Sequence, residues 1–430
     1  MLLFNQKVQK SLLTGFIFFL VAANVYAQVN INSPYSRFGV GELATSRNTY
    51  NFSMGGIAYA ISNSQYINPY NPASNAAFDS MSFLFSGGMV SKFGTHKTDY
   101  LSSKTNFASL GYLLFGFPIT KWMKSSIGLI PFSNVGYDIV AHQVVENVGS
   151  TDFYFKGLGG LNEFYFNSSF QLHKNLAIGA KASYLFGKSN NSKLVFFPDS
   201  IGMLNTKVDT YVEVGNMYFD FGAQYKKQIS KGLTLGLGAI YAPSQNIHAT
   251  LNYIARSYFG TAIGIESFRD TIAMELDKPG TITIPEKYGF GVMLKKNEKW
   301  MVGADYGWQN WSDYNAFGQL DSLKNSMQFS VGGEYLPSEK VYTKYWKRVK
   351  YRVGFRYNNT YLNLNNTQIN EFGISFGMGL PVPRSLSTIN LGLEWGKKGT
   401  TSNNLIQDNY VKLTLDVSIW ERWFVKRPLF

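Results

Sequence analysis

Strict alternation of apolar with polar or small residues dominates the chain after about residue 80. In the last run of this kind, every second position is apolar: Val411, Leu413, Leu415, Val417 and Ile419. A repeat of two residues is the period of a β-strand, in which successive side chains point to opposite faces. The pattern gives fourteen strand candidates, at roughly 82–92, 107–117, 125–140, 161–173, 175–188, 211–226, 232–242, 286–296, 299–310, 326–336, 349–359, 370–381, 386–397 and 408–420. The sequence therefore predicts an all-β chain.

The connections between these strands are alternately short and long. The short set comprises 118–124, 173–175, 227–231, 297–298 and 382–385, with 337–348 as a longer exception. The long set comprises 189–210, 243–285 and 311–325. A soluble β-sandwich has no reason to sort its connections in this way, whereas an outer-membrane barrel has short periplasmic turns and long outer loops. We therefore predict a transmembrane antiparallel β-barrel of about 14 strands over 81–420, with a periplasmic tail at 421–430.

The beginning of the chain has the pattern of an export signal. Lys7 and Lys10 precede an apolar run from Leu12 to Ala23, and Val25-Tyr26-Ala27 supplies the small residues of a cleavage site. Residues 1–27 are therefore predicted to be a secretory signal peptide, which agrees with an outer-membrane location. The chain contains no cysteine, which excludes a lipoprotein anchor, a disulfide framework and a cysteine nucleophile.

Composition agrees with a barrel and bears on its partners. Aromatic residues make up 16% of the chain and there are 41 glycines, as expected of a barrel with aromatic girdles at both membrane interfaces. The formal net charge is +13, but an exported chain does not meet nucleic acid, so no nucleic-acid partner is expected. Many lysines fall beside the short turns, for example Lys226, Lys227 and Lys231. They either attract anionic headgroups of the inner leaflet or simply keep the turns soluble.

Charged residues on the polar faces of the strands are expected to point into the lumen. An Arg or Lys that faces lipid at the membrane midplane costs roughly 2–4 kcal/mol. The residues concerned carry both signs of charge: Lys181, Asp220, Asp305, Glu334, Arg352, Arg356, Glu394, Lys412 and Asp416. Mixed signs favour an interior salt-bridge network over an ion filter of one sign.

The segment before the first strand, residues 28–80, does not alternate. It contains Gly55-Gly56 and later Asn71-Pro72-Ala73, residue types that favour compact irregular structure. A barrel of this size would otherwise enclose an open water channel. We therefore interpret 28–80 as an N-terminal hatch, or plug, inside the lumen.

Proline interrupts the third strand candidate. Pro131 lacks the N–H that a strand ladder needs, and Gly128 and Gly136 lie on either side of it. The break in pairing that this predicts is either a lateral opening in the wall or an ordinary bulge.

Three stretches of sequence, taken in order, carry a family resemblance. Met54–Ala60 with Asn71-Pro72-Ala73-Ser74 looks like a hatch with an Asn-Pro-Ala motif, and Ile127–Phe132 looks like a third strand that is kinked inward. The stretch from Pro285 to Tyr314 is similar to a strand pair that ends in Trp-Ser-x-aromatic. Together they resemble the FadL-like family of outer-membrane transporters for long-chain fatty acids and aromatic hydrocarbons. The resemblance covers essentially the whole mature chain, although Ser74 replaces a glycine that is typical of the family.

The resemblance implies a function and a set of binding residues. A member of this family would be a porin-like channel for passive uptake of hydrophobic compounds, resembling fatty acids or hydrocarbons, with outer-membrane lipid and a small apolar ligand as its partners. Its outer loops would capture the ligand, here with Phe196, Phe197, Tyr258 and Phe259, and the kinked strand would release it laterally. The carboxylate of a ligand could pair with one of three basic residues, which otherwise belong to the lumen network: Lys181, Arg352 and Arg356.

Uptake has three alternatives: a role in secretion, a closed structural barrel without transport, and catalysis. FadL-like barrels also include members that act in secretion, so the alternative is a protein-binding shuttle or a subunit in surface protein secretion, with a secretion-system protein as partner. Catalysis has little support, because the four histidines form no known metal or catalytic motif: His96, His142, His173 and His248. The chain is therefore not expected to be an enzyme, and no metal or cofactor is expected.

Overall fold

Fourteen long strands form the wall of the protein. The computed structural model describes residues 32–44, 48–199, 202–260, 266–321, 323–340 and 342–422, so the expected signal peptide and most of the expected tail lie outside the described residues. The wall strands are β2 (Ser82–Lys97), β3 (Ser102–Pro118), β4 (Met123–Val145), β5 (Gly149–His173), β6 (Leu176–Phe196), β7 (Asn205–Ser230), β8 (Leu233–Ala242), β11 (Lys287–Lys296), β12 (Trp300–Gln309), β15 (Ser326–Tyr335), β16 (Lys350–Leu364), β17 (Thr367–Pro381), β18 (Thr388–Lys398) and β19 (Gln407–Arg422).

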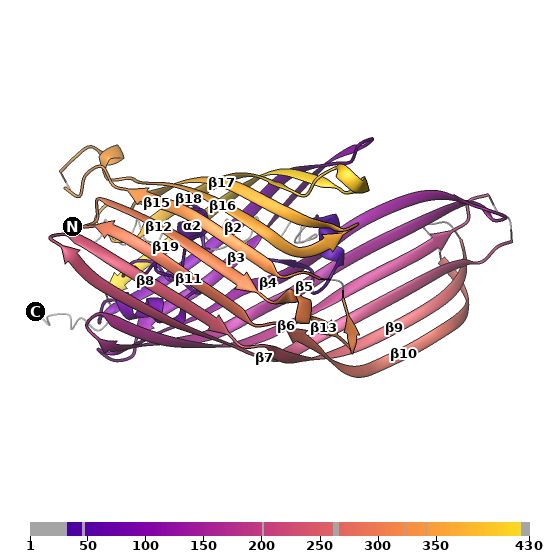
Figure 1. The fold of residues 1–430 in the computed structure, drawn as a ribbon, viewed down its shortest axis with the longest axis horizontal. Helices are drawn as coiled ribbons and strands as arrows, with labels where there is room; N and C mark the ends of the chain where they lie inside the picture. Colours follow the sequence, from indigo (N-terminus) through magenta and orange to yellow (C-terminus); the bar gives the residue numbers. More distant parts are fainter. Residues whose placement is uncertain are drawn as a thin grey trace, which may run out of the picture.

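These strands close into an antiparallel barrel. Each wall strand pairs with the next along the chain, β8 pairs with β11, and β19 pairs with β2 to complete the ring (Figure 1). Every predicted strand corresponds to one strand of the wall, so the all-β barrel of fourteen strands is confirmed. Because the ring is closed, the part of the sheet that forms the barrel has no free edge. A barrel in lipid requires this, since unpaired backbone groups there would have no water to bond.

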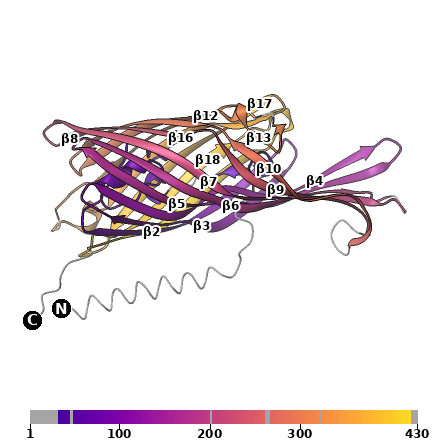
Figure 2. The same ribbon diagram turned by 90° about the horizontal axis from the view of Figure 1, so that it is seen from below.

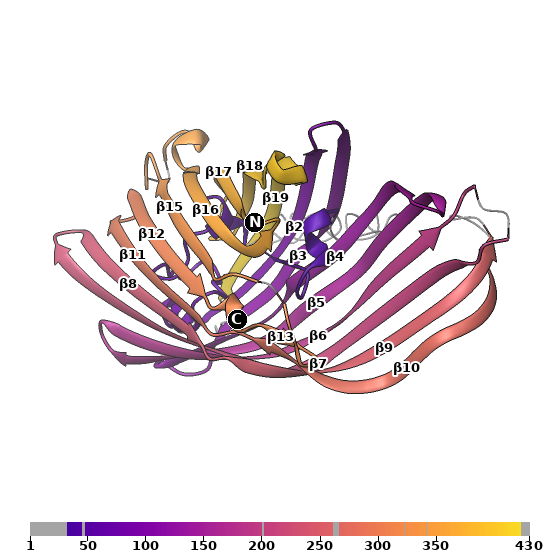
Figure 3. The same ribbon diagram turned by 45° about the vertical axis from the view of Figure 1, so that its right-hand side comes forward.

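A six-stranded extension continues the sheet beyond one end of the barrel. It consists of the outer halves of β4, β5, β6 and β7, together with β9 (Gln245–Gly260) and β10 (Glu266–Ile284), and it projects to one side (Figures 1 and 3). The prediction that 189–210 and 243–285 are irregular loops was therefore wrong in large part. In the extension both faces of the strands lie outside the barrel, so the sequence loses the apolar-to-polar alternation that marks the wall.

The inverted polarity of a membrane barrel is present in the wall. Phe219 and Phe221 of β7 are 42% and 46% exposed, whereas Asp220 between them is 6% exposed. The apolar face therefore points outward and the polar face points to the lumen, as expected.

The short helices are η2 (Pro34–Arg37), α2 (Thr49–Phe52), η3 (Pro72–Ala77), η4 (Trp311–Asp313), η5 (Tyr345–Lys347) and η6 (Ser402–Asn404), and the short strands are β1 (Glu42–Leu43), β13 (Asn315–Ala316) and β14 (Gln319–Leu320). Within the described ranges, every helix falls short of the length and apolarity needed to span a membrane.

The elements before β2 lie within the outline of the barrel, where their indigo ribbon is enclosed by wall strands (Figure 2). Residues 48–79, called the inner segment below, are mostly buried. Two caps order this segment locally: the Asn48 side chain accepts a hydrogen bond from the N–H of Asn51, and the Asn71 side chain accepts one from the N–H of Ala73. These are the N-cap contacts that allow such short helical turns to form.

Candidate functional site

Glycines of the wall lie where the inner segment touches it. A methyl group at Gly238 of β8 would overlap the carbonyl of Tyr59, and one at Gly354 of β16 would overlap the backbone N of Gly55. Similar close approaches occur on strands around most of the barrel, at Gly179, Gly222, Gly291, Gly332 and Gly377. The inner segment thus fills the space that these glycines leave on the inner face of the wall.

Hydrogen bonds hold the inner segment at these contacts. The carboxylate of Asp305 accepts hydrogen bonds from the backbone N–H groups of Ala58 and Tyr59, at 2.6 and 2.9 Å. Three wall strands away, on β17, Ser375 Oγ accepts a hydrogen bond from the N–H of Gly55 at 2.8 Å. Asn71 donates from its side chain to the carbonyl of Tyr59 at 2.6 Å. A charged acceptor makes the stronger kind of hydrogen bond, so Asp305 is a principal anchor of the segment.

The five hatch residues fall within this arrangement. Gly55 and Gly56 adopt positive φ values of 68° and 82°, where a side chain would be strained. Asn71, Pro72 and Ala73 form the start of η3 and lie against β6 and β7.

The buried basic residues of the lumen are already paired with carboxylates. Lys181 Nζ lies 2.6 Å from Glu163 and 2.8 Å from Asp220, and Arg352 lies 2.7 Å from Glu334. Arg356 contacts Glu371 at 2.6 Å and Glu394 at 2.9 Å. The predicted salt-bridge network is confirmed. A ligand carboxylate would have to displace an internal partner at each of these basic residues, which favours the structural interpretation of all three.

The third and fourth wall strands separate in their outer halves. The ladder between β3 and β4 runs from Pro118↔Lys124 to Leu113↔Leu129 and ends there. Beyond this point β3 pairs only with β2, whereas β4 continues to pair with β5. We call this interruption the β3–β4 seam. Pro131 lies two residues past the last pair, and the β4–β5 register shifts between Pro131 and Ser133.

The N-terminal residues 33–44, called the strap below, take the edge of β4 that β3 leaves free. Strand β1 pairs with Ser133 and Asn134, and the N–H of Ala44 donates to the carbonyl of Phe132 at 2.9 Å. Farther along, the N–H of Ser33 donates to the carbonyl of Gly136 at 2.8 Å. The strap thereby satisfies backbone groups that an open strand edge would leave unpaired.

The three residues expected at a lateral opening lie at different positions along the seam. Gly128 belongs to the last paired stretch, where an added Cβ would lie 2.7 Å from Tyr165 and 2.7 Å from Leu114. Pro131 stands at the bulge, and Gly136 bonds the strap. The sequence pointed to this stretch because Pro131 lacks the N–H that a strand ladder needs. No feature of the sequence predicted the strap.

An apolar cluster fills the outer part of the lumen and reaches the seam. The T-shaped contact between Phe132 and Tyr218, with ring centroids 6.0 Å apart, joins β4 to β7, three strands along the wall. Trp311 is fully buried and stacks on Tyr361 at 4.5 Å. We call this set the upper cluster; its buried members are Tyr35, Val40, Leu161, Leu185, Val214, Tyr218, Ala242, Ile247, Ala249, Ile282, Ile284, Trp311, Tyr314, Leu323, Tyr361, Leu362, Ile369 and Leu405.

The strap is part of this cluster. Tyr35 and Val40 are among its buried members, and Phe38 and Leu43 pack against it. Polar contacts add to the packing, because the Tyr361 hydroxyl donates to the carbonyl of Gly41. Sequence reasoning missed both the strap and the cluster. Their signal was the aromatic and glycine content of residues 35–41, which has no period and so no structural interpretation by itself.

An ion pair fixes the strap to the wall. Glu42 lies 2.9 Å from Lys398 of β18. Burial opposes ionisation of this carboxyl, yet the charges of Lys398 and Lys92 lower the pKa of Glu42 from 4.5 to about 2. Because the pKa is lower in the folded protein, the ion pair stabilises the attached strap above pH 4.5, and this contribution is lost as the pH falls towards 2.

We expect Glu42→Gln to loosen the strap, because Lys398 then keeps its charge without a partner. Cleavage within the strap by pepsin, followed from pH 4.5 down to 2, measures the effect. The native chain should resist at pH 4.5 and become sensitive as the pH falls, whereas the variant should be sensitive throughout. Glu213→Gln is the control, since Glu213 forms only an exposed pair with Lys188. Equal resistance of Glu42→Gln and the native chain would remove the ion pair from this account.

The four residues expected to capture a ligand lie on the extension. Tyr258 is fully buried and Phe259 is 41% exposed, both near the end of β9. Phe196 ends β6, and the N–H of Phe197 donates to the Asn205 side chain at 3.1 Å. Because Asn205 also pairs with Tyr258, the structure brings Phe197, the residue after β6, close to Tyr258 of β9.

Within the described ranges, no group of three or more His, Cys, Asp or Glu side chains is arranged to hold a metal ion. The features that stand out are therefore the β3–β4 seam, the strap and the upper cluster.

Comparison with known proteins identifies the family of this barrel. The model of the family described as BamG matches residues 8–429. The chain belongs to the BamG family. A comparison with curated proteins gave no match.

Solved structures share the fold of this BamG-family chain. The CymD monoaromatic hydrocarbon channel matches with 13% identity and a TM-score of 0.56, over 87% of this chain and 98% of that one. The Ralstonia pickettii toluene transporter TbuX matches with 15% identity and a TM-score of 0.55, over the same two shares. A Pseudomonas aeruginosa FadL homologue matches with 12% identity and a TM-score of 0.57, over 89% of this chain and all of that one. The resemblance to the FadL-like family is confirmed, and the chain is an outer-membrane β-barrel.

Proposed function

We propose that this BamG-family barrel carries small apolar molecules into the outer membrane and releases them sideways at the β3–β4 seam. The observation that carries the proposal is the end of the β3–β4 ladder at Leu113↔Leu129, beside the upper cluster. Below the seam β3 and β4 are hydrogen-bonded, as are the other adjacent strands of the wall. An apolar solute that reached the seam would pass from side chains to lipid without crossing water.

The inner segment supports a lateral rather than an axial route. Its backbone contacts glycines on several strands of the wall, among them Gly238 on β8 and Gly354 on β16, and Asp305 anchors it. We propose that it is the hatch that closes the lumen towards the periplasm. A solute held above it has the seam as its way out.

The upper cluster supplies the chemistry of an apolar binding region. Burial of a hydrocarbon stabilises it by about 0.8 kcal/mol per CH₂, so aromatic and aliphatic side chains can hold a dilute ligand. The strap packs into the cluster and also bonds the edge of β4 at Ser133 and Asn134. On this proposal, movement of the strap exchanges its own side chains for those of the ligand and opens the seam.

Binding of a protein at the cell surface is the second candidate. The extension exposes apolar side chains well beyond the barrel: Val144 is 82% exposed, Ile272 is 60% exposed and Met274 is 59% exposed. Exposed apolar groups of this kind are typical of interaction surfaces. We infer that the extension would be the contact region if the barrel served surface protein secretion.

Native mass spectrometry of the barrel, extracted gently from its own membrane, tests the proposed function. Uptake of apolar molecules is expected to give a small-molecule adduct that delipidation removes and that hydrocarbon or fatty acid restores. A stoichiometric protein companion with no apolar adduct would contradict uptake and favour the second candidate.

A further inference from the structure

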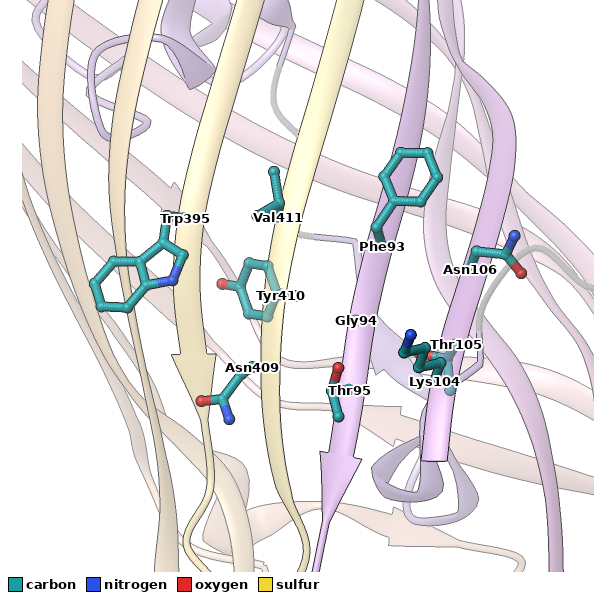
Figure 4. A pocket seen from close by; sticks show the side chains of 10 residues that line it. All are labelled: Phe93, Gly94, Thr95, Lys104, Thr105, Asn106, Trp395, Asn409, Tyr410 and Val411. Carbon is teal, nitrogen blue, oxygen red and sulfur yellow. The ribbon is translucent and has the colours of Figure 1, made fainter. Parts of the chain in front are cut away.

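A groove on the outer face of the wall lies apart from the lumen and its cluster. It spans four neighbouring strands, β18, β19, β2 and β3, and has a volume of about 490 Å³ (Figure 4). Phe93 and Trp395 are 52% and 49% exposed and flank it, whereas Tyr410 between them faces the lumen and is 2% exposed. The groove therefore opens towards the membrane.

Strand register gives the groove two chemically different rows. In the lower row, Trp395 is paired with Val411, Val411 with Phe93, and Phe93 with Asn106. In the upper row, two residues nearer the strand ends, Lys397 is paired with Asn409, Asn409 with Thr95, and Thr95 with Lys104. The lower row is largely apolar, and the upper row is polar with a lysine at each end: Lys104 lines the groove, and Lys397 lies just beside it as the strand partner of Asn409.

The aromatic residues indicate the depth of the groove in the membrane. Trp395 packs against Phe372 of the next strand, with ring centroids 5.7 Å apart, as part of the outward aromatic belt at the outer end of the wall. Such belts lie at the boundary between hydrocarbon and headgroups. The lower row therefore faces acyl chains, and Lys104 and Lys397 reach the headgroup level of the outer leaflet.

The two lysines of the upper row have no carboxylate of their own. Among the described residues, neither Lys104 nor Lys397 forms an ion pair, and no Asp or Glu lines the groove. The neighbouring lysines that face the lumen differ, since Lys92 pairs with Asp408 at 2.5 Å and Lys398 pairs with Glu42. Three strand spacings separate Lys104 from Lys397, about 14 Å across the sheet. The outer face thus presents two separated cations above an apolar floor.

We propose that this groove binds an outer-leaflet lipid whose headgroup carries two separated phosphates. The phosphates lie at Lys104 and Lys397, where a cation on a flexible stem suits them. An acyl chain lies along Phe93, Val411 and Trp395. The part of β3 that carries Lys104 and Asn106 pairs with β2 but not with β4. The bound lipid therefore lies next to the seam. The proposal does not depend on the function proposed for the seam.

Lipid binding to the purified mature chain, counted by native mass spectrometry in mixed micelles, tests the site. The probe is diphosphorylated lipid A, compared with phosphatidylethanolamine at the same concentration. We expect Lys104→Gln with Lys397→Gln to lower lipid A retention by about tenfold or more, since each lysine near anionic lipid favours binding. Lys299→Gln with Lys340→Gln removes the same charge at the opposite end of the barrel and should leave retention unchanged.

Further arms of the experiment separate the two parts of the groove. Phe93→Ala with Trp395→Ala is expected to weaken retention of lipid A while the lysines remain. Inorganic phosphate in excess should not displace the lipid, because it has no chain for the apolar row. Equal retention by the lysine variant and the native chain, equal retention of phosphatidylethanolamine, or displacement by phosphate alone would each overturn the proposal.

Discussion

Alanine at Gly238 is expected to dislodge the inner segment and to turn a closed barrel into a leaking one. The new methyl group would overlap the carbonyl of Tyr59, and backbone cannot rotate away as a side chain can. Overpacking of this kind typically costs about 1–3 kcal/mol. Hydrogen bonds between strands hold the wall in place. We therefore expect the overpacking to displace the inner segment and not the wall. Ion conductance in planar bilayers measures the result.

The matched control is Gly236→Ala, two residues away on the same face of the same strand. An added Cβ at Gly236 would approach the terminal carbon of Met293 at 2.8 Å, and that flexible side chain can move. We expect Gly236→Ala to conduct as little as the native barrel. Equal conductance of all three proteins would mean that the inner segment is not seated by the wall glycines.

A disulfide between the strap and β4 is expected to abolish uptake of an apolar solute. Leu43 and Ser133 are direct partners across the β1–β4 pair. Cα atoms of paired antiparallel residues are about 4.5–5.5 Å apart, a separation that a disulfide can bridge. The chain has no cysteine of its own, so Leu43→Cys with Ser133→Cys introduces the sole pair. Accumulation of a radiolabelled hydrocarbon by cells should fall to background when the pair is oxidised and return after reduction.

The control disulfide joins strands that are not expected to separate. Gln143 of β4 and Thr151 of β5 are partners in the extension, beyond the strap. Oxidation of Gln143→Cys with Thr151→Cys should leave accumulation unchanged. If the strap disulfide also left it unchanged, the strap would not be a gate and the route at the seam would have to be abandoned.

Most of the wall could be predicted from the sequence because lipid and lumen impose opposite polarity on successive residues. The run from Val411 to Ile419 shows this directly, and the charges at Arg352 and Arg356 could be assigned to the lumen by the cost of facing lipid. The extension could not be predicted in the same way. Its strands from 205 to 210 and in β10 have no lipid on either face, so their alternation is weak and they were interpreted as loops.

The candidate site was predicted at one point and missed at the others. Pro131 marks a break in any strand, because it lacks the N–H that a ladder requires. The strap has no such mark: Glu42 and Leu43 form strand β1 only because β4 offers them an edge. Trp311 and Tyr361, 50 residues apart in sequence, stack through tertiary packing alone. Contacts of this range leave no local periodic signal.

Photolabelling with an apolar aryl diazirine tests the central claim most directly. The probe is equilibrated with the barrel in membranes, activated by light, and its attachment sites are mapped by mass spectrometry. The account predicts labels on the strap and around Phe132 that excess hydrocarbon suppresses, besides the labels that lipid-facing residues such as Phe219 and Phe221 receive in any barrel. Labels confined to the lipid-facing residues, unchanged by excess hydrocarbon, would contradict a route through the upper cluster to the seam.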